Sequence, residues 1–278
     1  MKLKKSKKSE FKRFKIIKNS VQLFFFALIS FIAIRHMVIS GREAAAVDAY
    51  CPFGAVESVL TYIFTGNFLP RIQISTFIIF GALVLAVIIS NKGFCGWICP
   101  LGTFQEWISN LARKLKIPKI NVSKQLDFYL RFVKYLFLIW IIYASYVFAS
   151  LVFRAYDPFI TLFHFGEGLI YDFETEKILA YLSLLLVIIG SLFIDRFWCK
   201  YACPLGAKIN ILALLSPTKI TRDEKKCTEC TLCDMNCPMN CEIMTKSKVK
   251  DVECIDCLKC VNICPVNALS LEIGGKNK

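Results

Sequence analysis

Eight cysteines near the C-terminus have the spacing of an iron-sulfur site. The order CxxCxxCxxxCP occurs twice, and the second copy starts 27 residues after the first. The first run holds Cys227, Cys230, Cys233 and Cys237, and the second holds Cys254, Cys257, Cys260 and Cys264. Three thiolates at this spacing can surround one corner of a 4Fe-4S cube, whereas the fourth cysteine lies too far along the chain to close the same cube. The fourth cysteine of each run is therefore expected to bind the cluster of the other run.

This pattern is typical of bacterial two-cluster ferredoxins and predicts two 4Fe-4S clusters in a small α+β domain. The expected ligands of the first cluster are Cys227, Cys230, Cys233 and Cys264, and those of the second are Cys254, Cys257, Cys260 and Cys237. Zinc is the first alternative, but zinc sites usually take four ligands in two pairs, which fits two identical four-cysteine runs poorly. Disulfides are the second, and they would need an oxidising compartment.

A ninth cysteine, Cys241, lies between the two runs. In the alignment of the repeat it falls opposite Ala268. A free cysteine often behaves as a small buried apolar residue. We therefore expect Cys241 to be buried and not to be a ligand.

The composition predicts that part of the chain lies in a membrane. Of the 278 residues 56% are hydrophobic, the mean hydropathy is +0.52, and the formal net charge is +14. Residues 1–18 carry nine basic residues and one acidic residue, directly before an apolar run. Basic residues in this position hold a chain end in the cytoplasm, near anionic lipid. The charge therefore indicates membrane topology, and no nucleic acid is expected as a partner.

Four apolar runs, at 21–40, 72–90, 135–153 and 178–194, each approach the length of a membrane-spanning helix, ~20 residues. Segment 91–129 contains six basic and two acidic residues, whereas segment 154–177 contains two basic and five acidic residues. Basic loops stay inside. We expect a multi-pass protein of the inner (cytoplasmic) membrane, with the N-terminus and the cysteine-rich C-terminal part in the cytoplasm.

Three domains follow from these patterns: a basic tail at 1–18, an all-α membrane domain at 19–216 with four transmembrane helices in a duplicated hairpin, and the ferredoxin domain at 217–278. The first apolar run also resembles a cleavable signal peptide, because Ala44, Ala45 and Ala46 follow it. Arg42 and Glu43 stand directly before these alanines and disfavour cleavage.

The membrane part contains an internal repeat. Residues 94–102 match 198–206 at an offset of 104, and 49–53 match 155–159 at an offset of 106. Each copy combines an outer turn, a second helix and an inner CxxxCP motif, which predicts two helical hairpins related by a pseudo-two-fold axis along the membrane normal. A short amphipathic stretch is expected after each motif, near 103–115 and 207–215.

The two CxxxCP motifs supply the pairs Cys95/Cys99 and Cys199/Cys203. On a helix, a separation of four residues places both thiols of a pair on one face. The duplication can bring the pairs together, and four thiolates suit a further iron-sulfur cluster. One alternative is a redox-inert role, in which the cysteines pack against the following prolines and each proline ends its helix. The pairs could also carry out disulfide-dithiol chemistry or bind copper.

Arg35 and His36 interrupt the first apolar run near its outer end. Ionisable residues at this depth are candidates for function. They suit a quinone site, where His36 accepts a proton and Arg35 holds the head group. A haem held by His36 and His164 is an alternative, and so is a structural role in which Arg35 reaches the interface and both histidines are solvated.

Cys51 and Asp157 occupy equivalent places on the two outer turns. They are candidates for a metal or proton site. Asp157 is equally a candidate for a helix cap.

The residues 94–101, the residues 199–206 and the two cysteine runs resemble a known family, the four-helix membrane polyferredoxins that include NapH and the C-terminal part of NosR. The resemblance extends from the first apolar run onward and carries over the twelve motif cysteines only. It implies four membrane helices, cytoplasmic CxxxCP motifs, a cytoplasmic ferredoxin module and electron exchange with the quinone pool.

The sequence therefore predicts a membrane-bound electron-transfer component, or a quinol dehydrogenase subunit, that connects the quinone pool with a redox protein whose identity the sequence does not give. The alternative is a maturation factor that delivers electrons, or a metal such as copper, to another enzyme.

Overall fold

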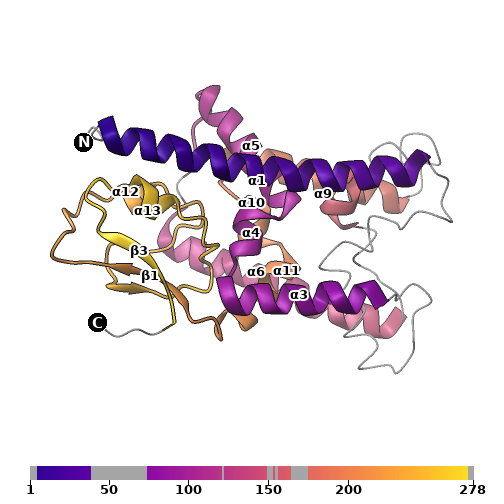
Figure 1. Cartoon of the computed structure of the whole chain (residues 1–278). Coiled ribbons are helices and arrows are strands. Elements are labelled where there is room, and N and C mark those ends of the chain that lie inside the picture. The colour runs from indigo at the N-terminus through magenta and orange to yellow at the C-terminus, as the bar shows by residue number, and fades with distance from the viewer. Residues whose placement is uncertain are drawn as a thin grey trace. The chain divides into compact units, whose positions relative to one another are not determined.

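The computed structural model describes residues 5–38, 74–120, 122–148, 153, 156–163 and 175–274 (Figure 1). The chain forms two compact units. We call Phe25–Val84 with Pro100–Lys208 the helical unit, and Met1–Phe24 with Leu85–Cys99 and Ile209–Lys278 the cysteine-rich unit. The domain boundaries expected after residues 18 and 216 stay predictions.

The helical unit is built from long apolar helices. It contains α5 (Pro100–Lys114), α6 (Lys124–Phe148), α7 (Pro158–Phe163), α9 (Thr175–Phe193) and α10 (Phe197–Tyr201), with parts of α1 (Lys5–Val38), α3 (Ile74–Ser90) and α11 (Pro204–Ala213). Helix α9 packs against α5 and α7, and α10 packs against α6 and α9. Leu138 and Ile141 of α6 are buried, as are Leu184 and Val187 of α9. The packing therefore joins segments from both copies of the internal repeat.

Two of the described helices are long and apolar enough to cross a membrane. These segments are Ser9–Arg35 of α1 and Lys124–Val147 of α6, and the apolar segments Phe80–Ser90 and Ile178–Phe193 are shorter. Helix α6 exposes Leu136, Ile139, Trp140 and Tyr143. A contiguous apolar surface of this kind is typical of a helix that faces lipid. Most of the described residues of each expected run lie on a helix, and the expectation of four spans is met in part.

The internal repeat is visible in the order of the elements. Helix α3 is followed by a turn, the short α4 (Gly93–Trp97) and α5, and α9 is followed by a turn, the short α10 and α11. Pro100 and Pro204 are the first residues of α5 and α11. Proline is well suited to a first helical position, where its missing N–H would have no partner. The prolines therefore begin the following helices, and α4 and α10 end shortly before them, at Trp97 and Tyr201.

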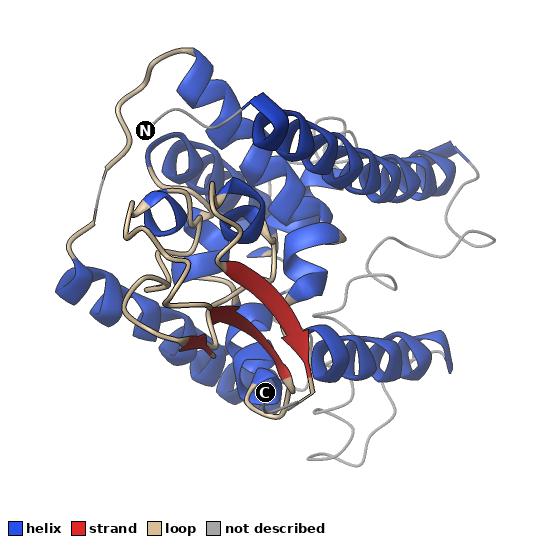
Figure 2. Ribbon diagram, turned by 60° about the vertical axis from the view of Figure 1, so that its left-hand side comes forward, coloured by secondary structure: helices blue, strands red, loops and turns tan. Residues whose placement is uncertain are grey.

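The C-terminal part of the cysteine-rich unit is a small α+β fold, as the spacing predicted. Its three-stranded antiparallel sheet has the order β2-β1-β3 (Figure 2). The elements are β1 (Thr218–Arg222), α12 (Leu232–Met235), β2 (Lys248–Val249), α13 (Lys259–Ile263) and β3 (Leu269–Ile273). Ile220 of β1 lies opposite Val249 on one side and Leu271 on the other. Ile220 and Val249 are buried with Met239 and Ile255 in the core beside the cysteines.

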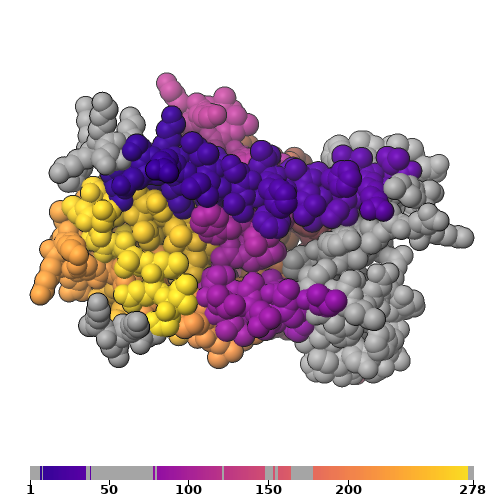
Figure 3. All heavy atoms as spheres, in the orientation of Figure 1, coloured from indigo at the N-terminus to yellow at the C-terminus, as the bar shows by residue number. Residues whose placement is uncertain are grey.

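The first part of α1 belongs to the cysteine-rich unit. Lys7 donates a hydrogen bond to Asn267, and the rings of Phe14 and Trp97 meet edge to face, 5.8 Å apart. In Figure 3 the first atoms of α1, in indigo, abut the C-terminal residues in yellow. This unit therefore combines segments from the start, the middle and the end of the chain.

Candidate iron-sulfur site

The two cysteine runs have the same backbone conformation. Non-glycine residues adopt positive φ at positions 27 residues apart: Glu229 and Asp256 (51° and 42°), Thr231 and Leu258 (57° and 54°), and Asn240 and Asn267 (51° and 52°). Left-handed conformations are uncommon for side chains of this kind. Alternating right- and left-handed residues turn successive N–H groups toward one point, which suits an anionic iron-sulfur group. The tandem repeat read from the sequence is therefore confirmed in the backbone.

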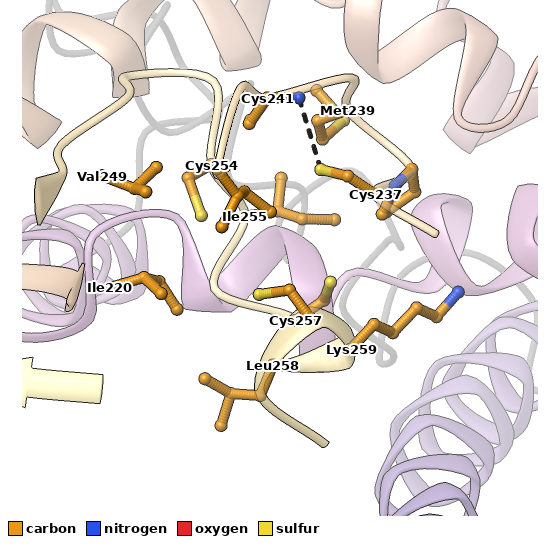
Figure 4. Close-up of a pocket in the computed structure, with 13 residues that line it drawn as sticks. Ile220, Cys237, Met239, Cys241, Val249, Cys254, Ile255, Cys257, Leu258 and Lys259 are labelled. Carbon is orange, nitrogen blue, oxygen red and sulfur yellow. Dashed lines mark hydrogen bonds between the residues drawn. The ribbon is translucent and has the colours of Figure 1, made fainter. Parts of the chain in front are cut away.

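A pocket in the cysteine-rich unit contains the four cysteines predicted for the second cluster. Cys254, Cys257 and Cys260 come from the second run, and Cys237 comes from the end of the first (Figure 4). The rest of the lining is mostly apolar and includes Ile220, Pro238, Met239, Ile243, Val249, Ile255 and Leu258. A set of soft thiols in an apolar pocket suits an iron-sulfur cluster. The structure brings this crossed set of cysteines together.

Of the first set, Cys264 belongs to the buried core, and Cys227 and Cys233 pack against that core. Cys230 is partly exposed. Among the described residues, no three His, Cys, Asp or Glu side chains are placed to hold a single metal ion. A 4Fe-4S cluster binds each cysteine through a different iron, so its ligands do not converge on one point. Both cysteine sets are compatible with clusters of this kind.

Backbone N–H groups point at the fourth cysteine of each run. Cys241 N donates to Cys237 Sγ at 3.4 Å, and Ala268 N donates to Cys264 Sγ at 3.3 Å. Hydrogen bonds to the sulfurs stabilise the thiolate and tune the potential of a bound cluster. The two halves of the site make the same bond.

Burial controls the protonation of the thiols. It raises the pKa of Cys257 to about 11, while the charges of Lys18 and Lys259 oppose the shift. Burial also raises the pKa of Cys233 to about 11 and that of Cys260 further still. Thiols with such pKa values are neutral near pH 7, so a metal must displace their protons when it binds.

The first CxxxCP motif belongs to the cysteine-rich unit. Cys95 packs against the core that contains Cys257 and Cys260. The indole N–H of Trp97 donates to the carbonyl oxygen of Asp256 at 3.0 Å. A Cβ added at Gly96 would lie 2.4 Å from the carbonyl oxygen of Ile255, so only glycine fits there. The motif therefore touches the loop that carries Cys254 and Cys257.

A buried ion pair holds the residues before this motif. Lys92 Nζ lies 3.3 Å from Glu253 Oε2, and the two side chains are 1% and 5% exposed. Asn210 Nδ2 donates to the other carboxylate oxygen at 2.8 Å, and Asn91 Nδ2 donates to the carbonyl oxygen of Cys254 at 3.3 Å. In the sequence, Lys92 contributed only to the charge of segment 91–129, and its buried ion pair was not predicted. The one signal for a structural role was its position three residues before Cys95.

The second CxxxCP motif lies in the helical unit, among partners of that unit. The Gln105 side chain accepts a hydrogen bond from Trp198 N (3.0 Å) and donates one to Cys199 Sγ (3.3 Å). Gly206 N donates to Cys203 Sγ at 3.3 Å. Both sulfurs therefore accept hydrogen bonds.

Charged side chains around this motif are buried and paired. Arg196 lies 2.8 Å from Glu106, Lys200 lies 2.6 Å from Asp127, and the Tyr201 hydroxyl also contacts Asp127. Lys200 and Tyr201 lie on α10, between the two cysteines of the motif. The short helix is thereby fixed to α6, which carries Asp127.

In both motifs the second cysteine lies outside the helix. Cys95 is in α4, which ends at Trp97, and Cys199 is in α10, which ends at Tyr201. Cys99 and Cys203 stand in the connection to the next helix. The expectation that both thiols of a pair lie one turn apart on one helix is therefore wrong. Cys95 and Cys99 belong to one unit and Cys199 and Cys203 to the other, so the meeting of the pairs stays a prediction.

The outer candidates are described only in part. Arg35 lies in α1 and is exposed. His36 lies in the same helix, but its side chain is outside the part of the chain that the structure describes. Cys51, His164 and the three alanines considered for signal-peptide cleavage lie outside the described residues. Asp157 Oδ1 accepts a hydrogen bond from Phe159 N at 2.9 Å, at the start of α7. Asp157 therefore acts as a helix cap, one of the two roles considered for it.

Three features define an iron-sulfur protein of the ferredoxin type. They are an apolar pocket with thiols from both runs, N–H groups that donate to the sulfurs, and a loop conformation that is repeated.

Comparisons with known proteins also indicate iron-sulfur binding. Residues 72–118 and 177–222 match a family described as a 4Fe-4S binding domain, and residues 249–270 match a second family of the same description. The first match covers the two repeat copies separately.

The chain is 31% identical to YccM of Escherichia coli, whose name refers to electron transport, over 79% of this chain and 61% of YccM. It is 32% identical to MJ0749 of Methanocaldococcus jannaschii over 70% of each chain. It is 28% identical to the ferredoxin-type protein NapH of Haemophilus influenzae over 57% of this chain and 52% of NapH. No solved structure matches it.

The chain belongs to the polyferredoxin family of 4Fe-4S proteins, as its motifs predicted. It is related to YccM and to the ferredoxin-type protein NapH.

Proposed function

We propose that this protein is a membrane-bound relay that passes electrons between the quinone pool and a redox partner. Two 4Fe-4S clusters would take up and release the electrons one at a time. Their ligands are the crossed sets: Cys227, Cys230, Cys233 and Cys264 for the first, and Cys254, Cys257, Cys260 and Cys237 for the second. The pocket that encloses the second set supports this assignment.

The observation that carries the proposal is that one helix serves both the cysteine-rich unit and a candidate span. Helix α1 donates to Asn267 through Lys7 and to the carbonyl oxygen of Gly96 through Gln22 (3.2 Å). Its Lys18 is buried and acts on the Cys257 thiol. The same helix contains the apolar segment Ser9–Arg35. A ferredoxin fold attached in this way would be held at the membrane that contains the quinone pool.

The remaining parts of the proposal follow from the charges of the loops and from the internal repeat of the membrane part. Four membrane helices, in α1, α3, α6 and α9, would place both chain ends and both CxxxCP motifs in the cytoplasm. Arg35, exposed at the far end of the Ser9–Arg35 segment, and His36 would form a quinone site. Cys95, Cys99, Cys199 and Cys203 would hold a further cluster. The packing of Cys95 against the core that contains Cys257 and Cys260 supports this part.

The proposal is tested in membrane vesicles that contain the protein. Addition of a quinol should reduce the clusters and produce their EPR signals, and Cys257→Ala should remove the signal of the second cluster. Reduction by dithionite without any effect of quinol would overturn the relay. Iron analysis gives about eight irons per chain for two clusters, and a higher number would indicate that the CxxxCP cysteines also hold a cluster.

Arg35→Gln should slow reduction by quinol and leave reduction by dithionite unchanged. Arg113→Gln, at the partly exposed end of α5, is the matched control and should keep the quinol rate. Copper that co-purifies in proportion to the protein, with no effect of quinol, would favour the maturation factor instead.

A further inference from the structure

Cys241 is the ninth cysteine of the ferredoxin part, and neither cluster has it as a ligand in the proposed assignment. It lies opposite Ala268 in the repeat, and the N–H groups of both residues donate to the sulfur four residues earlier, at 3.4 Å for Cys241 and 3.3 Å for Ala268. The preceding residues, Asn240 and Asn267, share the same φ within a degree (51° and 52°). The backbone is therefore equivalent at the two positions, and the thiol is the difference between them.

This thiol lies among the ligands. Cys241 lines the same pocket as the four cysteines of the second set (Figure 4) and is 3% exposed. Its backbone N–H donates to Cys237 Sγ, so Cys241 lies next to the ligand that it would replace. Cys254 lines the same pocket. The pocket therefore contains five thiols for four positions.

We propose that Cys241 is a reserve ligand of the second cluster, able to replace Cys237. This inference rests on the ligand assignment proposed above. When Cys237 is lost, the Cys241 thiol gives its proton to solvent and its sulfur bonds to the iron that Cys237 would have held. No electron is transferred in this exchange. The first cluster has no such reserve, because Ala268 occupies the equivalent position.

The repeat provides a matched pair of variants in the full-length protein. In Cys237→Ala the second cluster should remain, so iron and acid-labile sulfide per chain should stay near the wild-type values. In Cys264→Ala the first cluster should be lost, and both values should fall by about four atoms per chain. The double variant C237A/C241A should then lose the second cluster as C264A loses the first. C241A alone should keep both clusters, because Cys237 is then present.

The reverse experiment adds a thiol to the other half. A268C in the C264A background should restore iron content and the EPR signal of the first cluster. Equal losses in C237A and C264A, with no recovery on adding A268C, would overturn the reserve ligand. If C237A does not fold, the iron content of A268C/C264A still tests whether a thiol at this position can replace the fourth cysteine. Full iron content in Cys257→Ala would instead overturn the ligand assignment, because Cys257 belongs to the set with or without the exchange.

Discussion

The two CxxxCP motifs share their sequence pattern but differ in their neighbours. Three residues before the first cysteine each copy carries a buried cation, Lys92 or Arg196, 1% and 2% exposed. Lys92 pairs with Glu253, the residue before Cys254, whereas Arg196 pairs with Glu106 of α5. The copies have therefore kept the buried cation and changed its partner. The first motif supports a loop of the ferredoxin, and the second supports helices.

The residues between the cysteines differ in the same way. Gly96 leaves space for the carbonyl oxygen of Ile255, whereas Lys200, at the equivalent position, fills its space and pairs with Asp127. Trp97 donates to a backbone carbonyl beside Cys257, and Tyr201 contacts Asp127. A duplicated element can thus serve two units when its pattern of cysteines is kept and the intervening side chains are exchanged.

Removal of the buried cation should have the largest effect. Lys92→Met and Arg196→Met each leave a buried carboxylate without its charged partner, which costs about 3–5 kcal/mol. K92M should lose iron from the second cluster, whereas R196M should lower the thermal unfolding temperature and keep the EPR signals. The double variant K92M/E253Q should recover most of the loss. Equal loss of EPR signal in K92M and R196M would show that the motifs do not differ in this way.

Gly96→Ala should have the next largest effect. Its Cβ would meet the carbonyl oxygen of Ile255 at 2.4 Å, and because a backbone atom cannot rotate away, we expect a loss of about 1–3 kcal/mol. Gly206→Ala is the control, since its Cβ would have no neighbour closer than 3.4 Å. Iron content after mild heating measures the difference. Similar retention of iron in G96A and G206A would contradict the close approach.

Trp97→Phe should have the smallest effect. It removes the hydrogen bond to the carbonyl oxygen of Asp256 and keeps the ring contact with Phe14, a loss of about 0.5–1.5 kcal/mol. Since this carbonyl lies beside Cys257, the variant should also shift the reduction potential of the second cluster in an EPR redox titration. Tyr201→Phe, at the equivalent position, should leave that potential unchanged. A shift of the reduction potential in Y201F and none in W97F would contradict the assignment of the first motif to the ferredoxin loop.

The sequence predicted the features that depend on local spacing. The crossed pocket of Cys237 with Cys254, the α+β fold and the equivalence of Cys241 with Ala268 all follow from an offset of 27 residues. The contact of Gly96 with Ile255 could not be predicted, because it joins residues far apart in the chain and has no periodic signal. The early start of α6 was missed for another reason. Its first turns carry charges such as Asp127, Arg131 and Lys134, which lower the hydropathy although all three side chains are largely buried.

The ion pair of Lys92 and Glu253 also constrains the order of events during synthesis. Its partners are 161 residues apart, so the pair cannot form until the ribosome has completed the apolar segments between them. During that interval Lys92 is a positive charge at the end of α3 without Glu253 beside it. In the membrane topology proposed above, such a charge would help to retain its loop on the cytoplasmic side. The same lysine would then act first on insertion and later, once Glu253 has been made, on the fold.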